Sequence, residues 1–245
     1  LIEHPQLEAI LYLAKIQESW IDDDVERAEK AYADLQKVLE RFPNWDYAAA
    51  AASYMSSVYV YCTWEEDKAI HFIELSNQLL EENLKGKKEK NAYLYRLYPY
   101  YQYFNHDNWG FIELWIKENK DAAIESHYKA MNLLSEHIIV DSLHYARALT
   151  RIGDLYDYVR DHLKAVEYYE RCFDYLPKRM LEEQVASYEK LASAYTHMGR
   201  GDKAIPEYLN SLAKLQEIPT QSERLHSTYA ELYRSIGNDY IKLDE

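Results

Sequence analysis

Apolar residues recur at intervals of three and four along most of the chain, with charged residues between them. Residues at this spacing lie on one face of an α-helix, because the helix has 3.6 residues per turn. Gly and Pro number only six each in 245 residues, so turns are few and long helices are favoured over many short strands. The pattern therefore predicts an all-helical chain in which each helix buries one face against a neighbour.

Residues 146–177 add a regular placement of large and small side chains to this pattern. Small residues are expected where two helices cross closely, and large residues beside the crossing. The filled positions are Leu149, Ile152, Gly153, Tyr156, Ala165, Tyr169, Cys172 and Pro177. We expect Pro177 to end the second helix, because proline cannot continue the hydrogen-bond ladder. This spacing resembles the tetratricopeptide (TPR) repeat, a pair of antiparallel helices.

Two further stretches repeat the same placement. The unit at residues 185–217 places Gly199 and Gly201 in the turn between its helices, with Asp202 as the expected N-cap and Pro206 near the first turn. A half unit begins at Ala230, and the chain ends after its first helix. The chain also begins without Met, so a capping helix and further repeats outside these residues are both open alternatives.

Weaker signatures extend the helix pairs toward the N-terminus. First helices are expected at about residues 5–20, 46–63 and 89–118, the last kinked or broken near Pro99 or residues 105–108. Second helices follow near Ala28, Ala69 and Ala123. The expected fold is an all-α, TPR-like α-solenoid of about five antiparallel helix pairs plus a final helix. It divides into divergent hairpins at residues 1–103 and a clearer TPR array at residues 104–245.

Charge and composition exclude several classes of function. The formal net charge of −14 argues against nucleic-acid binding, which needs clustered Lys and Arg. The uncharged run at residues 47–64 is too rich in Ala and Ser for a membrane span, so close helix packing is expected there. Cys62 and Cys172 are isolated, which favours buried thiols in a reducing, cytoplasmic location. The 25 tyrosines suit seams between stacked helices.

Catalytic, cofactor and metal motifs are not found in the sequence. The glycines are scattered, so there is no phosphate-binding loop, and zincin, hydrolase and kinase signatures are absent. His137, Asp141 and His144 have a helical ligand spacing but straddle an expected loop. The adjacent Asp22, Asp23 and Asp24 are best explained by the start of a helix, whose dipole they complement. No enzyme activity, cofactor or metal is expected.

Three segments resemble the Rap phosphatase branch of peptide-responsive TPR regulators of Gram-positive bacteria. They are YYQYF, KDAAIESHYKAMNLL and HYARALTRIGDLYDYVRDHLKAVEYY, and residues 8–43 are similar to the N-terminal helices of that family. The resemblance implies a short signalling peptide bound on the concave surface of the array. Phosphatase members use a Gln in an N-terminal helix. The comparable residues 46–61 contain no Gln, so no catalytic residue is carried over.

A binding role is the function that these observations favour. The first helices of stacked repeats line the inner surface of the superhelix, where positions 2, 5, 9 and 12 face a ligand. We expect peptide- or protein-binding residues at these positions and at the neighbouring Arg151. They are Arg147, Thr150, Arg151, Asp154, Asp157, Glu189, Ser193, Thr196, Arg234 and Asn238. The alternatives are a Rap-like regulator that acts on a response regulator, and a structural module that self-associates through the exposed end of the array.

Overall fold

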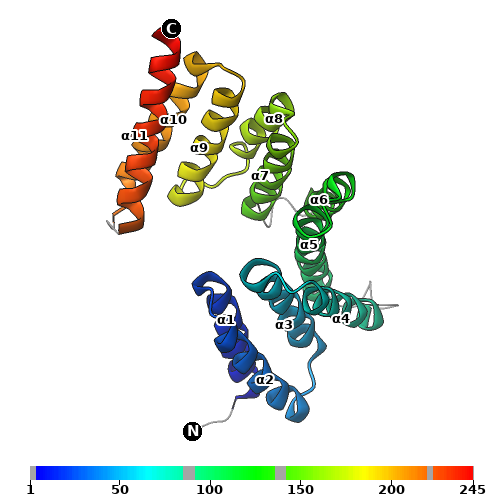
Figure 1. Ribbon diagram of the computed structural model, residues 1–245. Helices are drawn as coiled ribbons and strands as arrows, with labels where there is room; N and C mark the ends of the chain where they lie inside the picture. The colour runs from blue at the N-terminus through cyan, green and yellow to red at the C-terminus, as the bar shows by residue number, and fades with distance from the viewer. Residues whose placement is uncertain (1–3, 85–91, 136–141, 220–222, 245) are drawn as a thin grey trace. The chain divides into compact units, whose positions relative to one another are not determined.

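The computed structural model describes residues 4–84, 92–135, 142–219 and 223–244, and within these ranges all regular structure is helical (Figure 1). The helices are α1 (Pro5–Asp22), α2 (Val25–Arg41), α3 (Trp45–Val58), the π-helix η1 (Tyr59–Thr63), α4 (Glu66–Leu84), α5 (Ala92–Trp115), α6 (Lys120–Ser135), α7 (Ser142–Tyr158), α8 (His162–Cys172), α9 (Leu181–His197), α10 (Gly201–Glu217) and α11 (Glu223–Asp244). The prediction of an all-α fold is confirmed.

The helices form two compact units, Leu1–His137 and Ile138–Glu245. In the first unit α1 packs on α2, α3 on α4 and α5 on α6; in the second α7 packs on α8, α9 on α10 and α11 on α10. The expected five helix pairs plus a final helix are therefore present. The sequence predicts a division of the chain between residues 103 and 104, where the repeat signatures become clearer. That division stays a prediction.

The three consecutive aspartates join α1 to α2. Asp23 takes the left-handed conformation, with φ of 57°, that ends α1. The Asp24 side chain caps α2 by accepting a hydrogen bond from the backbone N–H of Arg27 at 3.0 Å, and Asp22 pairs with the Arg27 guanidinium at 3.0 Å. These contacts satisfy a free backbone N–H at the helix start. The cluster starts a helix, as the sequence predicts.

Small side chains let α3 lie deep in the first unit. Residues 49–52 are all Ala and are at most 1% exposed, which explains the uncharged run by close packing. Among the described residues, no helix is both long and apolar enough to cross a membrane.

Polar side chains bridge α3, α4 and α5 inside the first unit. Asn105 on α5 accepts a hydrogen bond from Ser53 Oγ and donates one to Ser76 Oγ, both at 3.0 Å. Three residues later, Asn108 donates to Ser56 Oγ at 2.7 Å. All five residues are at most 1% exposed. Because a buried amide needs partners, these bonds make the polar groups compatible with the interior.

Glycine makes room for a ring at two helix crossings, one in each unit. A Cβ on Gly153 of α7 would lie 2.6 Å from Cε1 of Tyr169 on α8, and a Cβ on Gly110 of α5 would lie 2.6 Å from Nε2 of His127 on α6. Both rings are therefore in contact with bare backbone. The imidazole of His127 is also paired with Asp107 at 2.9 Å in the buried interior. The close crossing expected at Gly153 is present.

Three helix boundaries differ from the prediction. The helix α5 is continuous from Ala92 to Trp115 with Pro99 inside it, so the expected break is absent. Asn105 and Asn108 bond to neighbouring helices instead of competing for their own backbone, which is compatible with an unbroken helix. The helix α8 ends at Cys172, and a series of tight turns follows before Pro177. The helix α10 begins at Gly201 with Arg200 as its N-cap, so Asp202 lies inside the first turn.

Two of these boundaries have contacts that explain them. The Phe173 ring packs against Tyr188 of α9, tilted by 32° with ring centroids 4.4 Å apart, and this contact favours a chain that leaves the helix before the proline. Asp202 pairs with the Arg200 guanidinium at 2.9 Å, so its carboxylate is engaged with a side chain instead of capping the backbone. Pro206 lies within α10.

Candidate functional site

The predicted binding residues lie on the first helices of the pairs in the second unit. We call this surface the A-helix face; it consists of Arg147, Thr150, Arg151, Asp154 and Asp157 on α7, Glu189, Ser193 and Thr196 on α9, and Arg234 and Asn238 on α11. None of these residues is fully buried. Their placement on three successive first helices follows the repeat spacing, whereas their role in binding stays a prediction.

Polar contacts cross from α7 to α9 along this face. Arg147 pairs with Glu183, and both carboxylate oxygens of Asp154 accept hydrogen bonds from Nζ of Lys190, at 2.5 and 2.6 Å. In both pairs the two partners are 36 residues apart in the chain. The side chains are a quarter to a half exposed, so each pair lies at the surface where the two helices meet. These contacts bring the A-helix faces of α7 and α9 side by side.

Asp154 also connects α7 to its own partner helix. It accepts a hydrogen bond from the hydroxyl of Tyr169 on α8 at 2.8 Å. Burial, reinforced by the negative charge of Asp154, raises the pKa of Tyr169 far above its ordinary value. The hydroxyl therefore stays protonated and acts as a donor at any physiological pH. One carboxylate thus joins three helices.

The contact between α9 and α11 is acidic. Thr196 donates a hydrogen bond to Asp239 at 2.6 Å, and the Asp239 side chain is only 2% exposed. Burial raises the pKa of Glu189, and the charge of Glu231 on α11 raises it further, while Lys190 opposes the shift. Acidic side chains from both helices thus lie close together here, and Lys242 is 3.9 Å from Asp239.

Two predicted residues on α11 remain open to a ligand. Arg234 and Asn238 are exposed, and neither makes a side-chain hydrogen bond or ion pair with another described residue. Their separation by four residues places them on the same side of the helix. They combine a cation with an amide, which can pair with a carboxylate or with peptide backbone groups.

The repeat positions did not identify Glu183 and Lys190, the ion-pair partners of the predicted residues Arg147 and Asp154. Glu183 precedes the repeat start at Val185, and Lys190 falls at a position not counted among the ligand-facing ones. The recurring separation of 36 residues between opposite charges is the signal that could have identified both pairs. A match of charges at that separation indicates stacking of neighbouring repeats.

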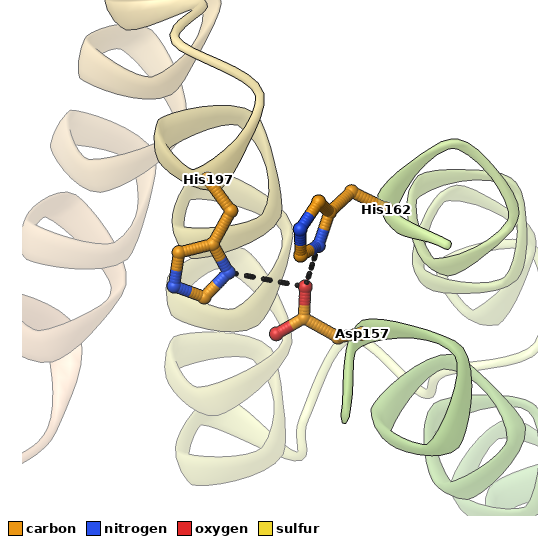
Figure 2. Close-up of side chains that lie close together, drawn as sticks. All are labelled: Asp157, His162 and His197. Carbon is orange, nitrogen blue, oxygen red and sulfur yellow. Dashed lines mark hydrogen bonds and ion pairs between the residues drawn. The ribbon is translucent and has the colours of Figure 1, made fainter. Parts of the chain in front are cut away.

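Asp157 lies in a second arrangement, with two histidines (Figure 2). Its Oδ1 is 2.6 Å from Nδ1 of His162 and 3.1 Å from Nδ1 of His197. The two imidazole rings are tilted by 45° with centroids 5.1 Å apart. Among the described residues, these three are the group of His, Cys, Asp or Glu side chains with atoms close enough to hold a metal ion. His162 and His197 were not singled out from the sequence.

The histidine group suggested by sequence spacing cannot be compared with this arrangement. His137 and Asp141 lie outside the described residues, and His144 lies in the first turn of α7. The aspartates at positions 22–24 serve as helix caps and ion-pair partners, as described above.

Comparison with known proteins places the fold among tetratricopeptide repeat proteins. Residues 146–179 match the tetratricopeptide repeat family, and no curated protein matches the sequence. The crystal structure of the apo form of RapI is similar over 96% of this chain and 61% of that chain, with a TM-score of 0.67 and 19% sequence identity.

Two other solved structures share the fold. A kinesin light chain from Podosopora anserina with nearly identical TPR-like repeats covers 90% of this chain and 100% of its own, with a TM-score of 0.54 and 14% identity. PilF of Pseudomonas aeruginosa covers 98% of this chain and 92% of its own, with a TM-score of 0.52 and 15% identity. At these identities the similarity concerns the fold, and this chain spans less than two thirds of the RapI chain.

Proposed function

We propose that this tetratricopeptide repeat chain is a scaffold or sensor that binds a peptide or protein segment on its A-helix face. The observation that carries the proposal is the alignment of α7, α9 and α11 through polar contacts. Asp154 meets Lys190, and Thr196 meets Asp239. A row of such helices offers side chains that can bond to the backbone of an extended or helical peptide.

The charges of the face indicate the character of the ligand. The arginine, lysine and acidic side chains between α7 and α9 pair with one another, which leaves little net charge there. On α11, Arg234 is exposed beside the acidic region around Glu189 and Glu231. A segment that carries one acidic and one basic group complements this surface better than a segment of a single charge.

Peptide selection with the whole chain tests the proposal. Random peptides displayed on phage would be selected against the immobilised protein, and the affinity of the selected peptides measured by fluorescence anisotropy. Arg234→Ala should weaken binding by roughly tenfold and Asn238→Ala by roughly threefold, because a hydrogen bond from a charged group contributes more than one from a neutral amide. Arg171→Ala on the second helix α8 is the matched control and should leave affinity unchanged. Equal affinity in all variants would rule out the A-helix face.

A Rap-like action on a response regulator is the second candidate. Its motivation is the sequence resemblance of residues 8–43 and of the segments from Tyr100 to Tyr169, which lie in both units. The lifetime of the phosphoryl-aspartate of candidate regulators would be measured with and without the protein. A shortened lifetime would support a phosphatase, and a regulator bound with its lifetime unchanged would support a non-catalytic regulator. No binding and no effect across the regulators would exclude this candidate.

Self-association through the end of the array is the third candidate. The helix α11 exposes Tyr233, Tyr240 and Ile241, each more than half exposed. Apolar side chains grouped on one helix can pack against a second copy of the chain. Analytical ultracentrifugation at increasing concentration decides the point. Dimers that are lost in Ile241→Lys support the candidate, and a monomer at all concentrations excludes it.

A further inference from the structure

We propose that Asp157, His162 and His197 bind a divalent transition-metal ion of the kind that imidazole nitrogen prefers, such as Zn²⁺. This inference goes beyond the proposed peptide binding and does not depend on it. Two imidazoles and one carboxylate are a ligand set that leaves one or more coordination positions for water or another donor. In the part of the chain that the structure describes, no other three side chains of metal-ligating type converge in this way.

The donor atoms already converge on a small volume. All three lie within 4.8 Å of one another, and Asp157 Oδ1 is 2.6 Å and 3.1 Å from the two Nδ1 atoms. Ligands at about 2.0–2.1 Å from a tetrahedral ion are separated from each other by about 3.3 Å. The Asp157–His162 distance of 2.6 Å therefore needs to open by about 0.7 Å, and the Asp157–His197 distance of 3.1 Å by about 0.2 Å, for an ion to enter.

The backbone holds two of the ligands in a fixed relation. Asp157 lies in the last turn of α7, and His162 is the first residue of α8. The turn between them is closed by a hydrogen bond from the backbone N–H of Asp161 to the carbonyl of Tyr156 at 2.8 Å, and Arg160 takes the left-handed conformation with φ of 65°. The Asp161 side chain then caps α8. A short, fully bonded turn presents both side chains to the same point.

The third ligand comes from the next helix pair. His197 is the last residue of α9, and α9 is held against α7 by the contact of Lys190 with Asp154. Figure 2 shows the imidazole of His197 approaching the carboxylate from the side opposite to α8. An ion at this position would connect two successive repeats.

The chemistry of the group distinguishes a transition metal from other cations. Mg²⁺ and Ca²⁺ prefer oxygen ligands, whereas two of the three donors here are nitrogen atoms. An ion is bound through a lone pair on Nδ1, so each neutral imidazole carries its hydrogen on Nε2 in the complex. The histidine side chains are 21% and 48% exposed, so an ion can enter from solvent and the rings have room to rotate.

Titration of the whole chain with ZnCl₂ tests the inference. The protein would first be treated with a chelator, and binding followed by isothermal titration calorimetry. We expect one Zn²⁺ per chain with a Kd of roughly micromolar order. Saturation should also raise the thermal midpoint by about 5 °C, because the ion binds only the folded state. The same titration with MgCl₂ should show no binding at this site.

Substitutions assign the site to these residues. His162→Ala and His197→Gln should each weaken Zn²⁺ binding by at least about tenfold, the lower end of the loss seen when even an outer ligand partner is removed. His71→Ala on the exposed surface of α4 is the matched control and should bind like the unmodified chain. Circular dichroism confirms that each variant is folded, and His197 is exposed enough for its exchange to be tolerated. Unchanged affinity in both variants, or equal affinity for Mg²⁺, would overturn the assignment.

Discussion

Lys190 on α9 donates hydrogen bonds to both carboxylate oxygens of Asp154 on α7, and so joins the first helices of two successive repeats. We expect a coupling free energy of about 0.5–1 kcal/mol between the two side chains. This is near the upper end for partly exposed ion pairs, because the ammonium group contacts both carboxylate oxygens. The coupling is measured by a double-mutant cycle of Lys190→Met and Asp154→Asn, followed by urea unfolding.

A second, exposed ion pair provides the comparison for this cycle. Lys37 and Asp34 lie three residues apart on α2 and form one contact at 2.8 Å. Their coupling should be smaller than that of Lys190 with Asp154, and both couplings should fall in 1 M NaCl. Equal coupling free energies in the two pairs would show that the contact between α7 and α9 stabilises the protein no more than an ordinary surface ion pair does.

Gly153→Ala should destabilise the protein because its Cβ would lie 2.6 Å from the Tyr169 ring. Overpacking of this kind costs about 1–3 kcal/mol, which exceeds the gain of up to about 1 kcal/mol in helix propensity. Gly237→Ala on α11 is the control, since no atom lies within 4 Å of its Cβ position. It should stabilise the chain. Chemical denaturation of the two variants measures both effects, and a stabilised Gly153→Ala would contradict the close crossing.

Glu189→Gln should stabilise the protein at pH 7 and have little effect at pH 3. Burial and the charge of Glu231 raise the pKa of Glu189, so the folded state favours the protonated form. The stabilisation from this group is complete at low pH and is lost as the pH rises through the folded-state pKa. The amide of Gln cannot ionise and therefore avoids this loss.

Thermal unfolding at the two pH values measures the difference between Glu189→Gln and the unmodified chain. Glu167→Gln on the exposed surface of α8 is the control and should change the midpoint little at either pH. A lower midpoint for Glu189→Gln at pH 7 would show that the carboxylate is stabilised in the folded state, contrary to the expectation.

The two thiols should react slowly with a disulfide reagent such as DTNB at pH 8. Burial, together with a hydrogen bond to Asp23, raises the pKa of Cys62 to about 11, and burial raises that of Cys172. Since the thiolate is the reactive form, labelling should be roughly 100-fold slower than for a free cysteine. Both thiols should react fully in urea. Rapid labelling of the native protein would contradict the raised pKa of the half-buried Cys62 and the burial of Cys172.

The sequence was sufficient to predict the helix pairs and the close crossing at Gly153, because these depend on local spacing. Gly153 and Ala165 are small residues at fixed separations from Tyr169 in the sequence, which is the spacing of a tetratricopeptide repeat. Asp24 was likewise identifiable as belonging to a helix start, since capping involves residues three apart. Such features need no knowledge of distant parts of the chain.

The boundaries and the convergence of side chains depend on contacts that are distant in the chain. The helix α5 continues because Asn105 finds hydroxyl partners on other helices, which its own neighbours in sequence do not indicate. His197 lies 40 residues from Asp157, and only the stacking of α9 on α7 brings the two side chains together. A candidate metal ligand of this kind becomes visible only when the register of the stacking is known.

The hydrogen bonds between serines of α3 and asparagines of α5 also disfavour alternative alignments of these two helices. A face made of alanines alone would permit one helix to slide along another with little change in contact. If α5 slid by one turn, at least one of Asn105 and Asn108 would lose its serine partner and face apolar side chains. Each unpaired buried polar group costs about 1–3 kcal/mol. The two amides therefore favour one alignment of α5 against α3 and disfavour alignments that are shifted by a turn.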